Sequence, residues 1–253
     1  MNKLTKNYLF FTFLIMIICW GTCVICSIND ITMKKHFWLF VPYLIGGFSP
    51  TIASFIALRR TQNITFKEWI KNIFDFKHSW TSYLLLVILA AAYILPLIFI
   101  CGYDNGAPIY AIFVMIPLMI IGGGLEEGGW RYILQPELDK QCPHILSTLI
   151  VSVIWWLWHL PLFFIQGLPQ YNQNYFAFGL NILGMSFALA SIRRNTNSVW
   201  LCVLFHSLIN SLSGIFIIKE NIIGNIVTAV ILIVLSLCID EWNKKKEKLT
   251  KSL

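Results

Sequence analysis

The sequence is poor in charge. Charged side chains make up only 12% of its 253 residues, whereas apolar side chains make up 57%. A soluble domain usually carries about a quarter charged residues, because these side chains cover its surface in water. This chain lacks the charge for such a surface, so lipid must be the solvent for much of it. The composition excludes a soluble globular protein and predicts an integral membrane protein.

The sequence also lacks any long hydrophilic stretch. No segment is polar enough over sufficient length to form a separate soluble domain, so we predict one integral membrane domain over residues 1–253. The first apolar run lacks a small-residue cleavage site and is followed by further runs, so we expect it to be retained rather than removed as a signal sequence. An internal repeat, which would favour a transporter with inverted halves, is also missing.

Apolar runs of membrane-spanning length recur along the chain. A helix needs roughly 17–25 mostly apolar residues to cross about 30 Å of hydrocarbon. Eight segments meet this requirement: 8–26, 38–58, 80–101, 108–130, 145–165, 175–192, 198–217 and 221–239. The predicted fold is therefore all-α, a polytopic membrane bundle of about eight transmembrane helices.

The basic residues are distributed unevenly between the two predicted sides. With the amino terminus placed in the cytoplasm, sixteen of the 19 Lys and Arg residues fall on the cytoplasmic side. Only Lys34, Lys35 and Lys219 fall on the other side. Cytoplasmic loops of membrane proteins carry such an excess of Lys and Arg. The net charge of +7 therefore indicates topology, with both termini cytoplasmic, rather than nucleic-acid binding.

One connecting segment has a helical pattern of its own. In residues 65–77 the apolar side chains recur at helical spacing and the lysines lie opposite them. This pattern is typical of a helix that lies along the membrane surface rather than crossing it. A plain charged loop is the alternative.

Ionisable and strongly polar residues are rare inside the predicted spans. Each costs several kcal/mol there unless it is paired or hydrated, so such residues often mark functional sites. The fourth, fifth and seventh segments contain five of them, and Arg131 directly follows the fourth: Glu126, Glu127, His159, His206, Asn210 and Arg131 form the set.

The spacing of these residues is helical. Glu127 and Arg131 are four residues apart, so the guanidinium can neutralise that carboxylate on one helix face. Glu126 then points about 100° away and is available for another interaction. His206 and Asn210 repeat the four-residue spacing, as do Trp155 and His159.

This set of side chains fits peptide-bond hydrolysis. A carboxylate and an imidazole that converge on one water can deprotonate it for attack on a carbonyl carbon. A second imidazole and a carboxamide can donate hydrogen bonds to the developing oxyanion. Each residue also has a structural alternative: a buried Glu–Arg pair can be purely stabilising, and His or Asn can join helices by hydrogen bonds. The argument for catalysis is that three separate segments each supply such groups.

Three ordered motifs carry a family resemblance. The first is EExxxR, present as Glu126-Glu127-Gly-Gly-Trp-Arg131. The second is an aromatic residue, a His and a Leu-Pro pair, present as Trp155-Trp-Leu-Trp-His159-Leu160-Pro161. The third is HxxxN, present as His206-Ser-Leu-Ile-Asn210.

In these motifs the sequence resembles the CAAX protease and bacteriocin-processing family of intramembrane glutamic endopeptidases, in its bacterial branch. A small-residue motif of that family is similar to Gly47-Phe-Ser-Pro50-Thr. The family usually has Phe where this chain has Trp155, which is a mild departure.

The resemblance implies a role for each site residue. Glu126 and His159 activate the water, and His206 and Asn210 form the oxyanion site. Glu127, Arg131 and Trp155 support them. Bacteriocin processing or self-immunity is the implied biological role. The expected partners are a peptide or protein substrate and the lipid bilayer, with no nucleic acid, and the expected location is a bacterial plasma membrane.

Two other functions compete with a metal-free peptidase. In the first, Glu126, His159 and His206 ligate zinc together with a water. The chain contains no HExxH motif, and the metal-free site gives Asn210 a role, so we expect no cofactor and keep zinc as the alternative. In the second, the chain is a non-catalytic immunity or scaffold protein whose polar cluster serves stability. Oligomeric state is left open.

Overall fold

The fold consists almost entirely of helices. The computed structural model describes residues 2–251, with side chains up to residue 246; the ends of the predicted domain, Met1, Ser252 and Leu253, lie outside the described residues. The helices are α1 (Lys3–Ile28), α2 (Phe40–Gly47), α3 (Ser49–Gln62), α4 (Phe66–Ile73), α5 (Trp80–Cys101), α6 (Ile112–Ile121), α7 (Glu127–Gly129), α8 (Gln135–Asp139), α9 (His144–Trp158), α10 (Tyr175–Thr196), α11 (Val199–Ile215) and α12 (Ile222–Lys251).

Long apolar helices account for most of the described chain. Six segments within residues 2–251 are long and apolar enough to cross a membrane: Lys3–Ile28, Trp80–Cys101, Ile109–Asp139, His144–Phe164, Tyr175–Thr196 and Ile222–Lys246. The count rises to seven if Phe37–Gly47 and Ser49–Gln62, a helix pair bent by 50°, form one span. Helix α11 is apolar but shorter. Each predicted segment corresponds to one of these, and the all-α membrane bundle is confirmed.

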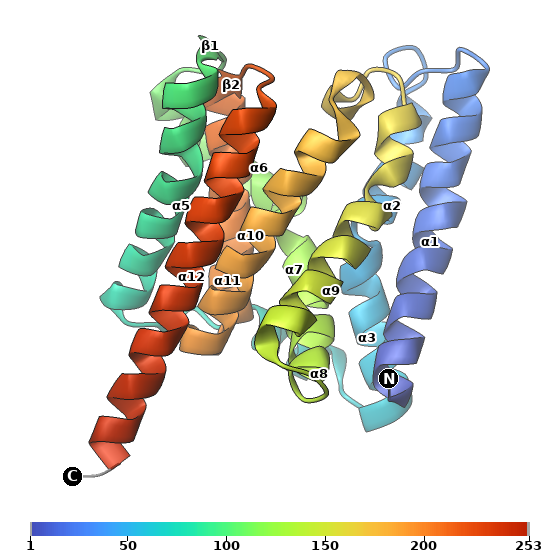
Figure 1. Ribbon diagram of the computed structural model, residues 1–253. Coiled ribbons are helices and arrows are strands. Elements are labelled where there is room, and N and C mark those ends of the chain that lie inside the picture. Colours follow the sequence, from blue (N-terminus) through green and yellow to red (C-terminus); the bar gives the residue numbers. More distant parts are fainter. Residues whose placement is uncertain (1, 252–253) are drawn as a thin grey trace.

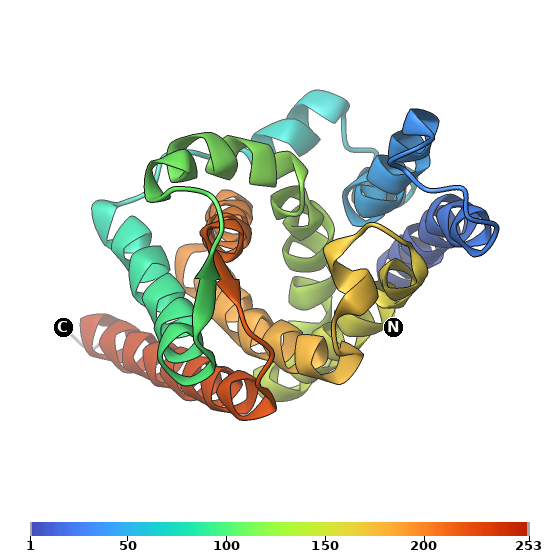
Figure 2. The same cartoon turned by 90° about the horizontal axis from the view of Figure 1, so that it is seen from above.

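The helices form two groups on either side of a central segment. Helices α1, α2 and α3 pack together, and α10 packs against α12 and α9. Helix α7 lies between the two groups (Figure 1), where it packs against α3 and α11, whereas α6 lies at the edge of the bundle against α11 (Figure 2). Helix α11 contacts α5, α6, α7 and α10, so it lies inside the bundle. The two ends of the chain lie at the same end of the bundle (Figure 1).

The distribution of side chains is that of a protein dissolved in lipid. Large apolar side chains face outward, such as Phe99 and Phe113, each 81% exposed. Charged side chains lie inside instead: Glu127 and Arg131 are fully buried. This arrangement is favourable in a membrane, where apolar surface faces the acyl chains and charges need partners within the protein.

A short strand pair joins two connections at the end of the bundle opposite the termini. Strands β1 (Tyr103–Asn105) and β2 (Phe216–Ile218) are antiparallel, with Asp104 opposite Ile217. The exposed pair of Lys219 Nζ and Asp104 Oδ1, 3.2 Å apart, lies beside it. Figure 2 shows the pair crossing the top of the bundle.

The segment predicted to lie along the membrane surface contains helix α4. Its first turn is closed by a reciprocal cap: the Thr65 hydroxyl accepts from the Glu68 N–H, and the Glu68 carboxylate accepts from the Thr65 N–H. The Thr65 hydroxyl and the Thr65 N–H both donate to the Glu68 carboxylate, and these two hydrogen bonds lower the pKa of Glu68. On the buried face, Trp69 Nε1 donates to Ser54 Oγ at 2.9 Å. The helix is confirmed, and its place at the membrane surface stays a prediction.

Candidate active site

The fourth predicted span is broken in its middle. Helix α6 ends at Ile121, and the chain turns at Gly122–Gly124 before Glu126. Gly123 has φ +155°, which side-chain-bearing residues rarely adopt. A Cβ atom there would overlap Asn210 Nδ2 and lie 3.2 Å from His206 Nε2. Glycine at 123 therefore lets the backbone pass close to the seventh predicted span and directs Glu126 inward. The predicted segment 108–130 lies within the apolar span Ile109–Asp139, and its helix is interrupted at Gly122–Gly124.

Gly128 and Gly129 allow the segment that contains Glu126 to pack closely against α3. A Cβ atom on Gly129 would lie 2.5 Å from the Pro50 carbonyl oxygen. The Thr51 hydroxyl donates to the Leu125 carbonyl oxygen, and Trp158 Nε1 donates to Ser49 Oγ at 3.1 Å. The small-residue motif at 47–51 therefore lies directly against the backbone of the interrupted span, and these contacts hold that span in place.

Glu127 has two basic partners. Its Oε2 atom lies 3.5 Å from Arg131 Nε, which is the ion pair that the four-residue spacing predicts. Its Oε1 atom accepts a hydrogen bond from His206 Nδ1 at 2.9 Å. The second contact was not part of the sequence prediction, because it joins residues 79 positions apart.

Glu126 points to a different neighbour. Its Oε2 atom accepts from Trp155 Nε1 at 2.8 Å. The Trp155 ring is fully buried and lies 5.4 Å from the His206 ring and 5.7 Å from the His159 ring, measured between centroids. The guanidinium of Arg131 lies 5.2 Å from the same ring. Trp155 is thus the side chain around which the polar groups are arranged, a role that the family resemblance alone did not indicate.

Both histidines are held through Nδ1. His159, which follows α9, places Nδ1 at 2.8 Å from the Trp155 carbonyl oxygen. A carbonyl oxygen only accepts, so Nδ1 of His159 carries the proton and Nε2 of the neutral ring has a free lone pair. His206 Nδ1 is directed to Glu127, so its Nε2 is likewise left for another partner. This nitrogen lies beside the Asn210 amide, next to Gly123.

The structure brings the sequence-predicted residues into one group. We call this group the central cluster; its members are Glu126, Glu127, Arg131, Trp155, His159, His206 and Asn210. The contacts above connect six of them, and Asn210 lies beside His206, next to Gly123. The group draws on residues 126–131, the end of α9 and α11. Their catalytic roles stay predictions. Sequence reasoning missed Gly123 and Arg193, whose Nε donates to the Arg131 carbonyl oxygen at 3.0 Å. The three consecutive glycines at 122–124 could have indicated from the sequence that Gly123 lies in a turn.

The zinc alternative requires ligand atoms that converge on one point. Within the described residues, no group of three or more His, Cys, Asp or Glu side chains is arranged to hold a metal ion. The donor set proposed for zinc, Glu126 with His159 and His206, is instead arranged around the Trp155 ring.

Comparisons with known proteins agree with this site. Residues 108–212 match the model of a family described as type II CAAX prenyl endopeptidase Rce1-like, a range that includes the whole central cluster. The chain is also 25% identical over 226 residues to CAAX prenyl protease 2 of Methanococcus maripaludis. That alignment covers 81% of this chain and 82% of the archaeal protein.

The fold, the site and these similarities define the class of protein as an intramembrane endopeptidase. Within that class, the chain is similar to the CAAX prenyl proteases, and its residues 108–212 match the Rce1-like type II CAAX prenyl endopeptidase family.

Proposed function

We propose that this endopeptidase hydrolyses its substrate without a metal, with Glu126 as the general base. The observation that carries the proposal is a set of hydrogen-bonding atoms in the central cluster that have no partner among the described residues. Both imidazoles are anchored through Nδ1, and neither Nε2 atom is hydrogen-bonded to a described residue. These two nitrogens and the Glu126 carboxylate are buried, and the half-buried Asn210 belongs to the same group, so we infer that a water and a carbonyl can be bound together there.

In the first step, Glu126 and His159 Nε2 orient a water. Glu126 takes a proton from the water as its oxygen attacks the carbonyl carbon of the scissile peptide bond. The carbonyl oxygen becomes an oxyanion, which accepts from the Asn210 amide and from His206 Nε2–H. The Glu127 carboxylate at His206 Nδ1 stabilises the doubly protonated ring, in which Nε2 is a donor.

In the second step, the tetrahedral intermediate collapses. The C–N bond breaks, and Glu126 returns its proton to the departing amine, so that the base ends in its starting form. Arg131 balances the charge of Glu127 throughout, because the two side chains are fully buried together. Nothing in this sequence of steps consumes a cofactor.

For the substrate we propose a peptide that reaches the site from the membrane. The archaeal relative is named as a CAAX prenyl protease, so a prenylated peptide with a C-terminal CAAX sequence is the first probe. A bacteriocin precursor in a bacterial plasma membrane is the second probe, and it rests on the motif resemblance alone.

The decisive experiment is Glu126→Gln in the full-length protein reconstituted in lipid. This change keeps the size and the acceptor for Trp155 but removes the base, so turnover of either probe should fall to background while insertion and thermal unfolding stay unchanged. Glu241→Gln, which changes an exposed carboxylate near the end of α12, is a matched control that should retain activity. Full retention of activity in Glu126→Gln would overturn the proposed mechanism.

A chelator experiment separates the metal-free site from the zinc alternative. The wild-type enzyme should keep its turnover after extensive chelation, and added zinc should not increase it. If activity disappears with chelator and returns with zinc, the attacking group is a metal-bound water, and Glu126 is not the general base. A non-catalytic scaffold would instead show no cleavage of any peptide and an unchanged biological effect in Glu126→Gln.

A further inference from the structure

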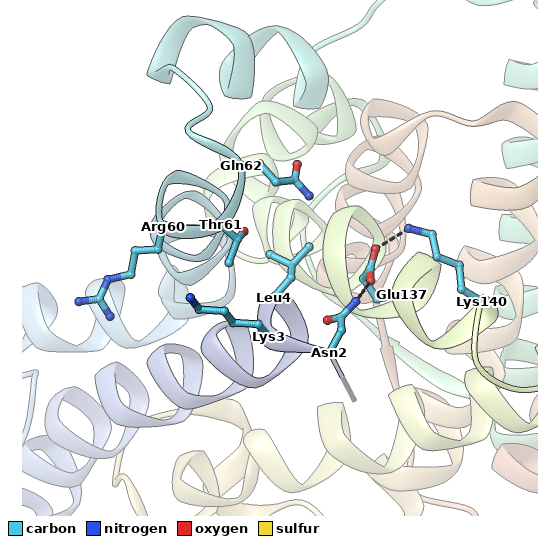
Figure 3. A pocket seen from close by; sticks show the side chains of 8 residues that line it. All are labelled: Asn2, Lys3, Leu4, Arg60, Thr61, Gln62, Glu137 and Lys140. Carbon is cyan, nitrogen blue, oxygen red and sulfur yellow. Dashed lines mark hydrogen bonds and ion pairs between the residues drawn. The ribbon is translucent and has the colours of Figure 1, made fainter.

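A polar pocket lies away from the central cluster, at the end of the bundle that holds the termini. Its volume is about 460 Å³. Three chain segments line it: residues 2–4 at the start of α1, residues 60–62 at the end of α3, and Glu137 with Lys140 at the end of α8 (Figure 3). Segments far apart in sequence therefore meet around one opening.

The charge of the pocket is positive. Lys3, Arg60 and Lys140 contribute three cations against the single carboxylate of Glu137. That carboxylate is already engaged: it accepts from the Asn2 amide and lies 2.5 Å from Lys140 Nζ (Figure 3). Its charge is therefore largely compensated within the pocket wall.

Two of the cations are available to another partner. Lys3 and Arg60 form no ion pair with any side chain among the described residues. The Arg60 guanidinium lies 4.9 Å from the Phe11 ring centroid, a contact that orients the group but leaves its N–H donors unused. An ammonium and a guanidinium at one opening are suited to the oxygens of a phosphate.

The surroundings of the pocket favour a phosphate that is attached to acyl chains. The pocket opens where α1 begins, at the side predicted to be cytoplasmic. Further along α1, the side chains of Phe10 and Ile17 are 61% and 60% exposed, which makes this surface suitable for lipid. A phospholipid can therefore place its phosphate at Lys3 and Arg60 while its acyl chains lie along α1.

We propose that this pocket binds the phosphate of an anionic phospholipid and so joins the start of α1 to the end of α8. Glu137 lies on the same segment as the Glu126 turn, six residues after Arg131. A lipid held here contacts the end of the catalytic segment without touching the central cluster. The proposal is independent of the peptidase mechanism.

The test is a lipid titration of the full-length protein in detergent, read by native mass spectrometry. Phosphatidylglycerol should bind more tightly than phosphatidylcholine, and the combined change Lys3→Gln and Arg60→Gln should weaken phosphatidylglycerol binding about tenfold or more. A basic residue at an anionic membrane surface contributes about fivefold in affinity. The matched control is Lys34→Gln with Lys35→Gln, which removes two exposed charges elsewhere and should leave binding unchanged.

A substitution that should strengthen phosphatidylglycerol binding makes the test more specific. Glu137→Gln removes the pocket's one carboxylate and frees Lys140, so phosphatidylglycerol should bind several-fold more tightly. Equal binding of phosphatidylcholine, an equal loss in the Lys34 and Lys35 control, or weaker binding in Glu137→Gln would each overturn the proposal. Inorganic phosphate that binds as tightly as phosphatidylglycerol would assign the pocket to a free anion and overturn the lipid assignment. Unfolding temperatures of all variants show that each remains folded.

Discussion

Two clusters of buried and half-buried polar side chains lie in this bundle, and they differ in how completely their hydrogen bonds are made. The second, which we call the end cluster, consists of Asp139, Thr148, Ser191, Arg194, Asn195 and Asp240. Arg194 donates to Asp240 at 2.9 Å, to Thr148 at 2.7 Å and to Asp139 at 3.4 Å. Asp240 also accepts from Ser191 at 2.6 Å and from Asn195 at 2.8 Å. Its carboxylate oxygens are fully used.

The central cluster is organised differently. The Nε2 atoms of both histidines are unused, and Arg131 Nη1 and Glu127 Oε2 have no hydrogen-bond partner among the described residues. A fully satisfied network fixes the packing of the helices that supply it. A network with spare donors and acceptors is ready to bind another molecule. The comparison indicates that the end cluster stabilises the fold and that the central cluster acts on a substrate.

The largest effect that tests this comparison is expected for Asn210→Ala. Loss of one oxyanion donor should lower turnover about 10²–10³-fold. Stability should not change, because the Asn210 amide is not bonded to a described residue. Initial rates with the peptide probe and thermal unfolding of the same sample measure both. A fall in unfolding temperature that accounts for the lost activity would make Asn210 a structural residue and remove the contrast between the clusters.

The opposite result is expected for Arg194→Ala. This change leaves the Asp240 side chain, 3% exposed, without its cation, and breaking a buried pair costs about 3 kcal/mol. The free energy of unfolding should fall by that amount, while turnover per folded molecule stays near wild type. Arg59→Ala, which removes an exposed arginine, is the control. A collapse of turnover without loss of stability would contradict the structural role of the end cluster.

A smaller effect is expected for Trp155→Phe, which keeps a ring but deletes the donor to Glu126. A hydrogen bond to a charged group contributes about 1.5–3 kcal/mol, so kcat/KM should fall about tenfold or more. The neighbouring Trp156→Phe is a matched control, since Trp156 Nε1 donates to the Tyr175 carbonyl oxygen at 3.0 Å, away from the cluster. Equal activities of the two variants would show that the Glu126 contact has no part in catalysis.

The smallest effect is expected for Lys219→Ala. Its ion pair with Asp104 is exposed, with side-chain exposures of 57% and 67%. Such pairs contribute about 0–1 kcal/mol, so stability should change little and turnover should not change. Thermal unfolding at low and high salt measures this. A loss as large as that of Arg194→Ala would mean that burial does not explain the difference between the two ion pairs.

Local patterns were predicted from the sequence, and long-range contacts were not. The apolar runs predicted the helices, and the four-residue spacing predicted the Glu127–Arg131 pair, because both depend on neighbouring residues in one helix. The contact between Glu127 and His206 depends on how α7 packs against α11, which no local spacing reveals. Ordered motifs indicated that the site residues meet, but not which atoms would be left free.

The end cluster was missed for a related reason. Arg194 was counted only as a basic residue of a cytoplasmic connection, and Asp240 lies just past the end of the eighth predicted segment. Their pairing depends on α12 continuing beyond that segment and packing along α10. Burial of these charges is thus a property of the assembled bundle. Composition and topology rules place such residues on a side of the membrane, but they do not pair them.

The strand pair β1–β2 has a consequence for counting the spans. Two strands can pair only on one side of the membrane, so the chain between Asn105 and Phe216 must cross it an even number of times. That stretch contains three long apolar segments, Ile109–Asp139, His144–Phe164 and Tyr175–Thr196. Parity then requires α11 to be a fourth crossing, although it has only 17 residues. A two-stranded contact of three residues thus favours eight crossings over seven.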